Sequence, residues 1–202
     1  NNLNIISVTM NFKSIDKYLI ETSRVIQSLK NHSKEITQIS QLIYKSQKKN
    51  KTIFVCGNGG SDSEAEHFVT ELLCTYDNKK RKPISAISLN SSASSISAWS
   101  NDFEYNTFLK RSIQAHCKKN DVLFILTTSG GSKKSSQSLN IVNAAIEAHK
   151  KKMKVIVLTG KEGGEVLKYS DLSIHIKSKK TSYIQESQLV ILHLICEFLE
   201  NL

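Results

Sequence analysis

Five short and almost wholly apolar segments recur along the chain and constrain its fold more than any other feature. They are residues 52–56, 84–89, 122–127, 155–159 and 172–176. Segments with apolar residues at helical spacing alternate with them, at 62–76, 104–118, 134–149, 163–169 and 183–201. Strands that are apolar on both faces and alternate with helices form parallel sheets covered on both sides. The pattern therefore predicts an α/β protein, a three-layer α/β/α sandwich around a five-stranded parallel sheet.

The stretch before the first strand predicts helices that precede the sheet. Apolar residues recur at intervals of three and four through residues 13–47, and this pattern breaks near Asn31-His32-Ser33. The 202 residues contain one proline and no low-complexity linker, which favours one domain. We expect a single domain over residues 1–202. Residues 1–50 would be an N-terminal helical segment used in oligomerisation, and 51–202 the α/β core with the C-terminal helix.

The last predicted helix is apolar on nearly every side after Gln188, in the sequence IQESQLVILHLICEFLENL. A helix that is apolar all round must be buried. Contacts between subunits are a natural place to bury it, so the sequence predicts a homo-oligomer.

A formal net charge of +10 raises the question of a nucleic-acid partner. The lysines are dispersed, however, and most fall at predicted helix ends or loops. No aromatic residues interleave with them as a stacking platform for bases requires. We therefore expect no nucleic-acid partner. We also expect no membrane span, because no apolar run approaches the roughly 20 residues that a span needs.

The four cysteines, Cys56, Cys74, Cys117 and Cys196, are scattered and include no C-x-x-C pair. This spacing argues against a disulfide framework and favours the reducing cytoplasm as the location of the protein. We expect each cysteine to be a small buried apolar side chain.

Polar, glycine-containing loops follow three of the predicted strands, where ligands bind in parallel sheets. They are residues 57–61 (GNGGS), 90–92 with 100–102 (NSS and SND), and 127–132 (TTSGGS). The last is the clearest phosphate candidate, because small hydroxyls and glycine N–H groups can converge on one anion. Neither glycine loop has a Walker or dinucleotide-binding spacing. Taken alone, each is equally explained by turn chemistry, with Ser61 or Ser132 near a helix N-cap.

Three further side chains carry two interpretations each. His67 and Glu71 are four residues apart, so on a helix they share a face. They are either an exposed polar pair or a metal-binding or acid–base pair. His193 lies inside the apolar stretch LVILHLIC. It is either a satisfied core residue or a functional group that projects toward a cleft.

The blocks CGNGGSDSEAEHFVTEL, SNDFEYNTF, DVLFILTTSGGS, KVIVLTGKEGG and IQESQLVILHL carry a family resemblance. From about Phe12 to the C-terminus, the chain resembles the phosphoheptose isomerases (sedoheptulose 7-phosphate isomerases) of the sugar isomerase (SIS) domain superfamily. The resemblance implies a flavodoxin-like SIS fold and a homotetramer with active sites at subunit interfaces. It also implies conversion of sedoheptulose 7-phosphate to D-glycero-D-manno-heptose 7-phosphate, the first step of bacterial heptose biosynthesis for surface polysaccharide.

The resemblance assigns roles to individual residues. The residues that would contact the sugar backbone or its hydroxyls are Asn58, Gly59, Gly60, Asn101, Asp102 and Gln185. Those that would cradle the phosphate are Ser61, Thr127, Thr128, Ser129 and Ser132. One zinc ion per subunit would be bound by His67, Glu71, Gln185 and His193. Glu71 and His193 match the catalytic pair of the family.

These residue types suit the implied chemistry, in which a proton moves between adjacent carbons through an enediol(ate). We assign the carbon-bound proton to Glu71 and the oxygen protons or ring opening to His193, with the reverse assignment open. Two other functions stay open. One is isomerisation of a different sugar phosphate, and the other is a non-catalytic SIS-domain regulator, like the replication-initiator-binding relative.

The chain departs from the family pattern at four positions. Thr75 and Tyr183 stand where members usually have Arg, Gln188 stands for a common His, and Thr127 replaces a Ser. Loss of two guanidinium groups would weaken the binding of an anionic substrate or shift the sugar preference. Lys177, Lys179 and Lys180, shortly before Tyr183, are the candidates to compensate.

Overall fold

A parallel sheet of five strands forms the centre of the computed structural model, which describes residues 12–201. The strands are β1 (Ile53–Cys56), β2 (Ala86–Ser88), β3 (Val122–Leu126), β4 (Lys154–Thr159) and β5 (Leu172–His175). Their order is β2-β1-β3-β4-β5, and every neighbouring pair is parallel. The predicted fold class is confirmed.

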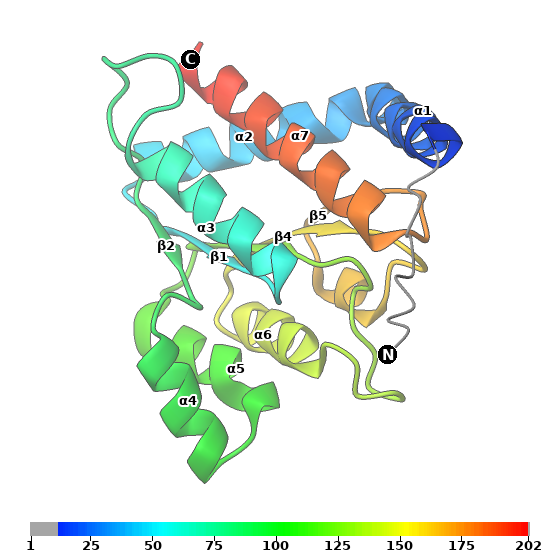
Figure 1. Cartoon of the computed structure of the whole chain (residues 1–202). Coiled ribbons are helices and arrows are strands. Elements are labelled where there is room, and N and C mark those ends of the chain that lie inside the picture. Colours follow the sequence, from blue (N-terminus) through cyan, green and yellow to red (C-terminus); the bar gives the residue numbers. More distant parts are fainter. Residues whose placement is uncertain (1–11, 202) are drawn as a thin grey trace, which may run out of the picture.

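Helices cover both faces of this sheet (Figure 1). Successive residues of a strand point to opposite faces. Along β3, Phe124 packs into one core while Leu123 and Ile125 pack into the other. The first core is shared with α2 (Ser33–Lys48), α3 (Gly60–Leu73) and α7 (Thr181–Glu200). The second is shared with α5 (Tyr105–His116) and α6 (Leu139–Lys150). Burial on both faces explains why β1 and β3 are apolar at every position.

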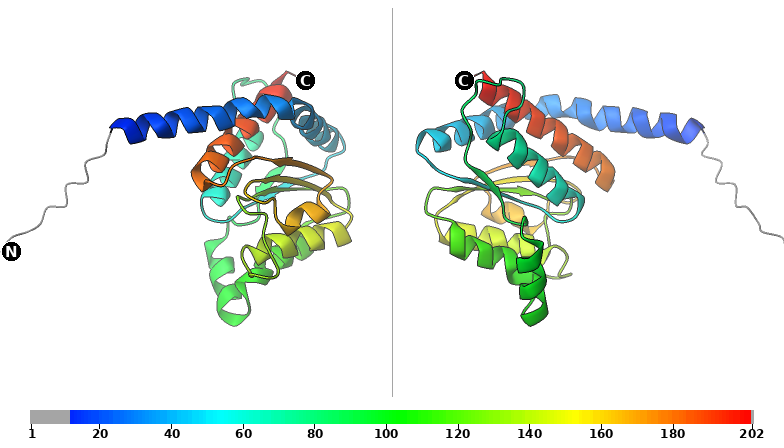
Figure 2. Two further views of the ribbon diagram at one scale, coloured as in Figure 1. Left: turned by 90° about the vertical axis from the view of Figure 1, so that its right-hand side faces the viewer. Right: turned by 60° about the vertical axis from the view of Figure 1, so that its left-hand side comes forward.

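The N-terminal helices match their prediction. α1 (Phe12–Ser28) passes through a 3₁₀ turn, η1 (Leu29–His32), into α2, which is where the apolar pattern breaks. Figure 2 shows that α1 extends beyond the body of the protein. Leu19 and Ile20 on this helix are 57% and 52% exposed. Residues 1–11 of the predicted segment 1–50 lie outside the described residues, and its use in oligomerisation stays a prediction.

Two helical predictions were wrong, and one helix was not predicted. The helix expected over 134–149 begins only at Leu139, because Ser136 and Ser138 have positive φ angles of 56° and 49°. The pattern also did not predict α4 (Ala93–Asp102). This helix is rich in serine and none of its residues is buried, so it carries no apolar periodicity. The predicted helix over 163–169 is a 3₁₀ turn, η2 (Glu165–Tyr169).

Three further expectations concern burial. Cys56, Cys117 and Cys196 are buried, but Cys74 is exposed, because it follows the last residue of α3 rather than facing a core. α7 buries one side within the chain and leaves Leu194 40% exposed. In residues 12–201, no helix has the length and apolar character needed to cross a membrane.

Candidate active site

The connections from β1 and from β3 lead toward opposite sides of the sheet, so the loops that follow these two neighbouring strands diverge. From β1 the chain goes to β2 on one side, and it then returns to β3 on the other. Loops that leave a parallel sheet at such a switch point diverge and open a crevice at the carboxyl ends of the strands. The GNGGS loop follows β1 and the TTSGGS loop follows β3. Topology thus brings the two predicted loops together.

A pocket of about 260 Å³ lies at this point. Its lining residues are uncharged, and they come from four separate segments of the chain. They are Asn58, Gly60, Ser61, Thr127, Thr128, Ser138, Thr181 and Gln185. All but two of these belong to the predicted site. Ser138 and Thr181 were missed because neither lies in a glycine-containing loop.

The amino ends of three helices meet at this pocket. α3 begins at Gly60, α6 follows Ser138, and α7 begins at Thr181. The first N–H groups of a helix have no partner within the helix, and the helix dipole makes this end favourable for an anion. With the hydroxyls of Ser61 and Thr128, these ends make the pocket suited to a phosphate group.

Gly60 brings the first loop against the last helix. A Cβ atom at Gly60 would lie 2.4 Å from Nε2 of Gln185, closer than any side chain permits. The preceding Gly59 has a φ of 56°, in the left-handed region that glycine adopts without strain. Gly60 therefore permits the close approach of the loop to α7, and Gly59 permits the backbone conformation of the turn.

The side chain of Asn58 is held by two residues that the sequence analysis missed. Its amide exchanges hydrogen bonds with the amide of Asn140, at 2.9 and 2.7 Å. The Tyr105 hydroxyl donates to Asn58 Oδ1 at 2.9 Å. Asn140 is only 1% exposed. A polar residue among the apolar positions of a predicted helix indicates a buried hydrogen-bonding role, so the sequence did carry a sign of this residue.

In the loop after β3, Thr127 and Thr128 reach the pocket. Thr127 Oγ1 accepts the N–H groups of Ser129 and Gly130 at 3.4 and 3.1 Å, so this hydroxyl shapes the turn. Ser132 Oγ accepts the N–H of Ser135 at 3.3 Å and does not line the pocket. It also caps no helix. The phosphate roles of Ser129 and Ser132 stay predictions.

Gln188 has a structural use that accounts for one departure from the family pattern. It is fully buried, and its Nε2 donates to the carbonyls of Thr127 and Leu158 at 2.9 and 3.1 Å. These carbonyls belong to the carboxyl ends of β3 and β4. Gln188 therefore fixes α7 against the end of the sheet where the pocket lies.

The predicted acid–base residues meet further along α3 and α7. His67 Nε2 lies 3.2 Å from Glu71 Oε1 and 3.3 Å from His193 Nε2. Tyr76 stacks on the His193 ring, with centroids 5.6 Å apart and planes at 29°. The His67 and Glu71 side chains are 41% and 21% exposed. His193 is thus not a core residue. It projects into a half-exposed cluster with His67 and Glu71.

This cluster has side chains of the types that bind zinc, but they do not form a complete metal site. Two imidazoles and a carboxylate are ligands that zinc prefers. Across residues 12–201, however, no three His, Cys, Asp or Glu side chains are gathered so that they could hold a metal ion. The fourth predicted ligand, Gln185, lies with its amide against Gly60.

Asn101 and Asp102 lie elsewhere in the chain. Both are exposed at the end of α4, and Asn101 Nδ2 donates to Asp102 Oδ1 at 2.9 Å. They line no part of the pocket described above. Their contact with substrate hydroxyls stays a prediction.

Two carboxyl groups in the first turns of α3 were not predicted as part of the site. Burial, and then the charge of Glu66, raises the pKa of Asp62 to about 6. Burial raises the pKa of Glu64 to about 8, although a hydrogen bond with Ser61 acts in the opposite sense. Glu64 is therefore largely protonated near neutral pH, between the pocket and the histidine cluster.

Tyr183, at the second position where Arg is usual, fastens α7 to α1. Its hydroxyl donates to Glu21 at 2.9 Å and accepts from Lys180 Nζ at 3.0 Å. The Lys180 ammonium lies 4.2 Å from the ring centroids of both Tyr183 and Tyr18. Of the three candidate lysines, Lys180 alone adjoins a pocket residue, Thr181.

The SIS domain family matches residues 17–160. The phosphoheptose isomerase of Helicobacter pylori (strain ATCC 700392 / 26695) is 34% identical over 92% of this chain and 93% of its own length. That of Leptospira biflexa is 41% identical over 74% of each chain.

Solved structures give the same result. A phosphoheptose isomerase from Francisella tularensis superposes with a TM-score of 0.87 at 28% identity, covering 94% of this chain and 98% of that one. The phosphoheptose isomerase from Neisseria gonorrhoeae superposes with a TM-score of 0.85 at 25% identity, covering 94% of this chain and 98% of that one.

Proposed function

Since this chain belongs to the SIS-domain family of phosphoheptose isomerases, we propose that it is an aldose–ketose isomerase acting on sedoheptulose 7-phosphate. The product is D-glycero-D-manno-heptose 7-phosphate, the first intermediate of bacterial heptose biosynthesis. The observation that carries this proposal is the placement of two chemically different sites along the same pair of helices, α3 and α7.

The separation of the two sites suits a long sugar phosphate. Ser61 and Gln185 line the pocket, whereas His67 and His193 lie six and eight residues further along α3 and α7. At a rise of about 1.5 Å per residue, these intervals are about 9 and 12 Å. A substrate with its phosphate at the pocket would extend along the helices and present its carbonyl end to the cluster.

In this mechanism the phosphate is held by helix N–H groups and by the hydroxyls of Ser61 and Thr128. Glu71 removes a proton from C1 of the ketose and returns it to C2, so that a C1=C2 enediol forms and collapses to the aldose. His193 moves a proton from O1 to O2 during the same passage. His67 lies 3.2 Å from Glu71 and 3.3 Å from His193, within hydrogen-bond reach of both side chains.

We propose one zinc ion per subunit, held by His67, Glu71, Gln185 and His193. The donor types support this proposal, as does the contact of His67 with both Glu71 and His193, at 3.2 and 3.3 Å. When bound, zinc polarises the substrate carbonyl and stabilises negative charge on the enediolate oxygens. Elemental analysis of protein purified without chelators tests it, with about one zinc per chain as the expected result.

We further propose a homotetramer with active sites at subunit interfaces, located in the cytoplasm. Exposed apolar side chains on α1 and α7, among them Leu19 and Leu194, support the assembly. Asn101 and Asp102 lie outside the pocket of their own chain, and a neighbouring subunit would bring them to it. The heptose produced would serve surface polysaccharide, as lipopolysaccharide or capsule.

Incubation of the purified protein with sedoheptulose 7-phosphate, followed by NMR, tests the activity. The expected result is a growing aldose signal. If none appears with folded, zinc-supplied protein, the proposed substrate is wrong. Turnover of another ketose phosphate would then indicate that Thr75 and Tyr183 have changed the sugar preference, while no turnover of any would favour a regulator.

A further inference from the structure

The proposed catalytic pair depends on how two helix ends are held together. Glu71 is in the last turn of α3, and His193 is on α7. The last carbonyls of a helix have no partner within the helix, and α3 ends without a glycine cap. The conformation of this end therefore has to be set from outside the helix.

Arg81 takes this role at the end of α3. Its guanidinium donates to the carbonyls of Glu71 at 2.5 Å and of Leu72 at 3.0 Å, and lies 3.5 Å from that of Cys74. The Arg81 side chain is only 8% exposed. A cation at the carboxyl end of a helix also complements the helix dipole. Arg81 thus binds the backbone of the residue whose carboxylate would take the substrate proton.

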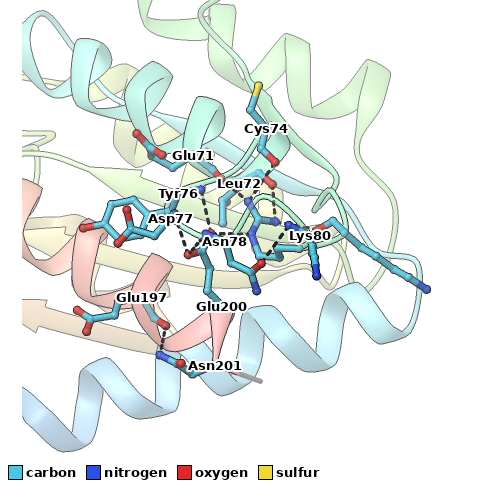
Figure 3. A network of polar contacts seen from close by, with 12 residues as sticks. Glu71, Leu72, Cys74, Tyr76, Asp77, Asn78, Lys80, Glu197, Glu200 and Asn201 are labelled. Carbon is cyan, nitrogen blue, oxygen red and sulfur yellow. Dashed lines mark hydrogen bonds and ion pairs between the residues drawn. The ribbon is translucent and has the colours of Figure 1, made fainter.

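Glu200, the last residue of α7, closes the network from the other helix (Figure 3). Its carboxylate accepts the N–H groups of Tyr76, Asp77 and Asn78 at 2.9, 2.8 and 2.8 Å. It also pairs with Arg81 Nε at 3.4 Å, and its side chain is 7% exposed. Burial opposes its charge, but these N–H donors and Arg81 hold the pKa of Glu200 below its ordinary value.

The network reaches His193 through Tyr76. Glu200 fixes the backbone of Tyr76, whose ring stacks on the His193 imidazole. His193 and Glu200 are seven residues apart on α7, so they share a helix face, directed at α3 and the loop that follows it. One buried pair thus contacts the backbone of Glu71 on one side and the residue that packs on His193 on the other.

We infer that Arg81 and Glu200 are positioning residues that set the His193 imidazole against His67 and Glu71, an inference that rests on the proposed function. Neither touches the reacting atoms. They act by joining the carboxyl ends of α3 and α7 and by placing Tyr76 against His193. Displacement of a reacting group by about 1 Å lowers rates by about 100-fold, so a distant clamp of this kind affects turnover.

The test is Glu200→Gln, which keeps the shape of the side chain but removes its charge and one acceptor. Asp121→Asn is the matched control. Asp121 is also a buried carboxylate that accepts two backbone N–H groups, those of Thr52 and Lys118, which precede β1 and β3 and belong to neither α3 nor α7. Both variants are expected to lose stability, and only Glu200→Gln to lose kcat, by about 10- to 100-fold with little change in KM.

A second readout needs no substrate. The His193 ring protons, assigned by their absence from the NMR spectrum of His193→Gln, are shifted by the ring current of Tyr76. Tyr76→Leu defines their position without stacking. Glu200→Gln is expected to move them toward that position, and Asp121→Asn to leave them in place.

Unmoved His193 signals in folded Glu200→Gln would overturn the inference, as would moved signals with wild-type kcat. If Glu200→Gln does not fold, Arg81→Lys carries the same test, because an ammonium keeps the charge but cannot span the carbonyls and Glu200 together. A wild-type protein without isomerase activity would refute the proposed function alone, because the NMR comparison still decides whether Glu200 positions His193.

Discussion

The pocket at the ends of β1 and β3 and the His67–Glu71–His193 cluster are built in different ways. The pocket consists of backbone N–H groups and short hydroxyls at strand ends and helix starts, such as Ser61 and Thr128. The cluster consists of long side chains from the middle and end of two helices, and it is half exposed. The pocket inherits its geometry from the sheet, whereas the cluster depends on helix packing and on contacts beyond it.

The largest effect is expected from breaking the cluster alone. Glu71→Gln and His193→Gln each remove a group that changes protonation, so kcat is expected to fall by about 10³-fold or more. Phosphate binding at the pocket is expected to persist, because neither residue lines it. Steady-state kinetics and inorganic phosphate titration measure the two properties separately. Near-normal kcat in either variant would remove that residue from the mechanism.

A break at the junction of the two regions is expected to have the next largest effect. Gly60→Ala places a methyl group 2.4 Å from Gln185 Nε2, so the amide has to leave the pocket wall. We expect kcat/KM to fall by about 10- to 100-fold.

Gly59→Ala is the matched control, since a Cβ there meets nothing within 4 Å and adds only the strain of a positive φ. It is expected to lose about 1 to 3 kcal/mol of stability, because a φ of 56° with a ψ of −122° is rare for any residue but glycine, and to lose less kcat/KM than Gly60→Ala. Equal kcat/KM for the two variants would contradict the role of the Gly60–Gln185 contact.

Within the pocket, Thr127 offers a sharper comparison of hydroxyl and shape. Thr127→Val keeps the volume but loses the acceptor for the N–H groups of Ser129 and Gly130. KM is expected to rise about tenfold, as expected for loss of about 1.4 kcal/mol of binding. Thr127→Ser keeps the hydroxyl and is expected to resemble the wild type. A KM for Thr127→Val equal to that of Thr127→Ser would show that the turn does not depend on this bond.

The smallest effect concerns Glu64, which lies on α3 between the two regions. Its pKa is raised to about 8, so the folded state holds a proton that the unfolded state releases near its ordinary pKa of 4.5. Stability from this group is fully present below pH 4.5 and is lost as the pH rises through 8. Glu64→Gln is expected to reduce this loss of stability with rising pH and to raise the Tm at pH 9 by about 5 °C.

Calorimetry at several pH values between 5 and 9 measures the effect. Glu66→Gln, an exposed neighbour on the same helix, is the control. Parallel pH curves for Glu64→Gln and the wild type would show that burial does not raise this pKa.

Much of the fold was predictable because its signals are local. The apolar runs predicted all five strands, since residues buried on both faces have to be apolar throughout. α4 was missed because a helix with no buried residue needs no apolar stripe. Ser138 was predicted to lie inside a helix, because nothing in its residue type signals the positive φ of 49° that the structure gives it.

Sequence alone determined the sheet and the loops at the ends of β1 and β3. It also singled out His67, Glu71 and His193, and the resemblance favoured their functional interpretation. Only the tertiary structure decided that His67 and His193, 126 residues apart, lie 3.3 Å from each other. It also decided that Asn140 orients Asn58 and that Arg81 and Glu200 join two helix ends. Strand and loop signals come from neighbouring residues, whereas the placement of one helix against another depends on side chains from the whole core.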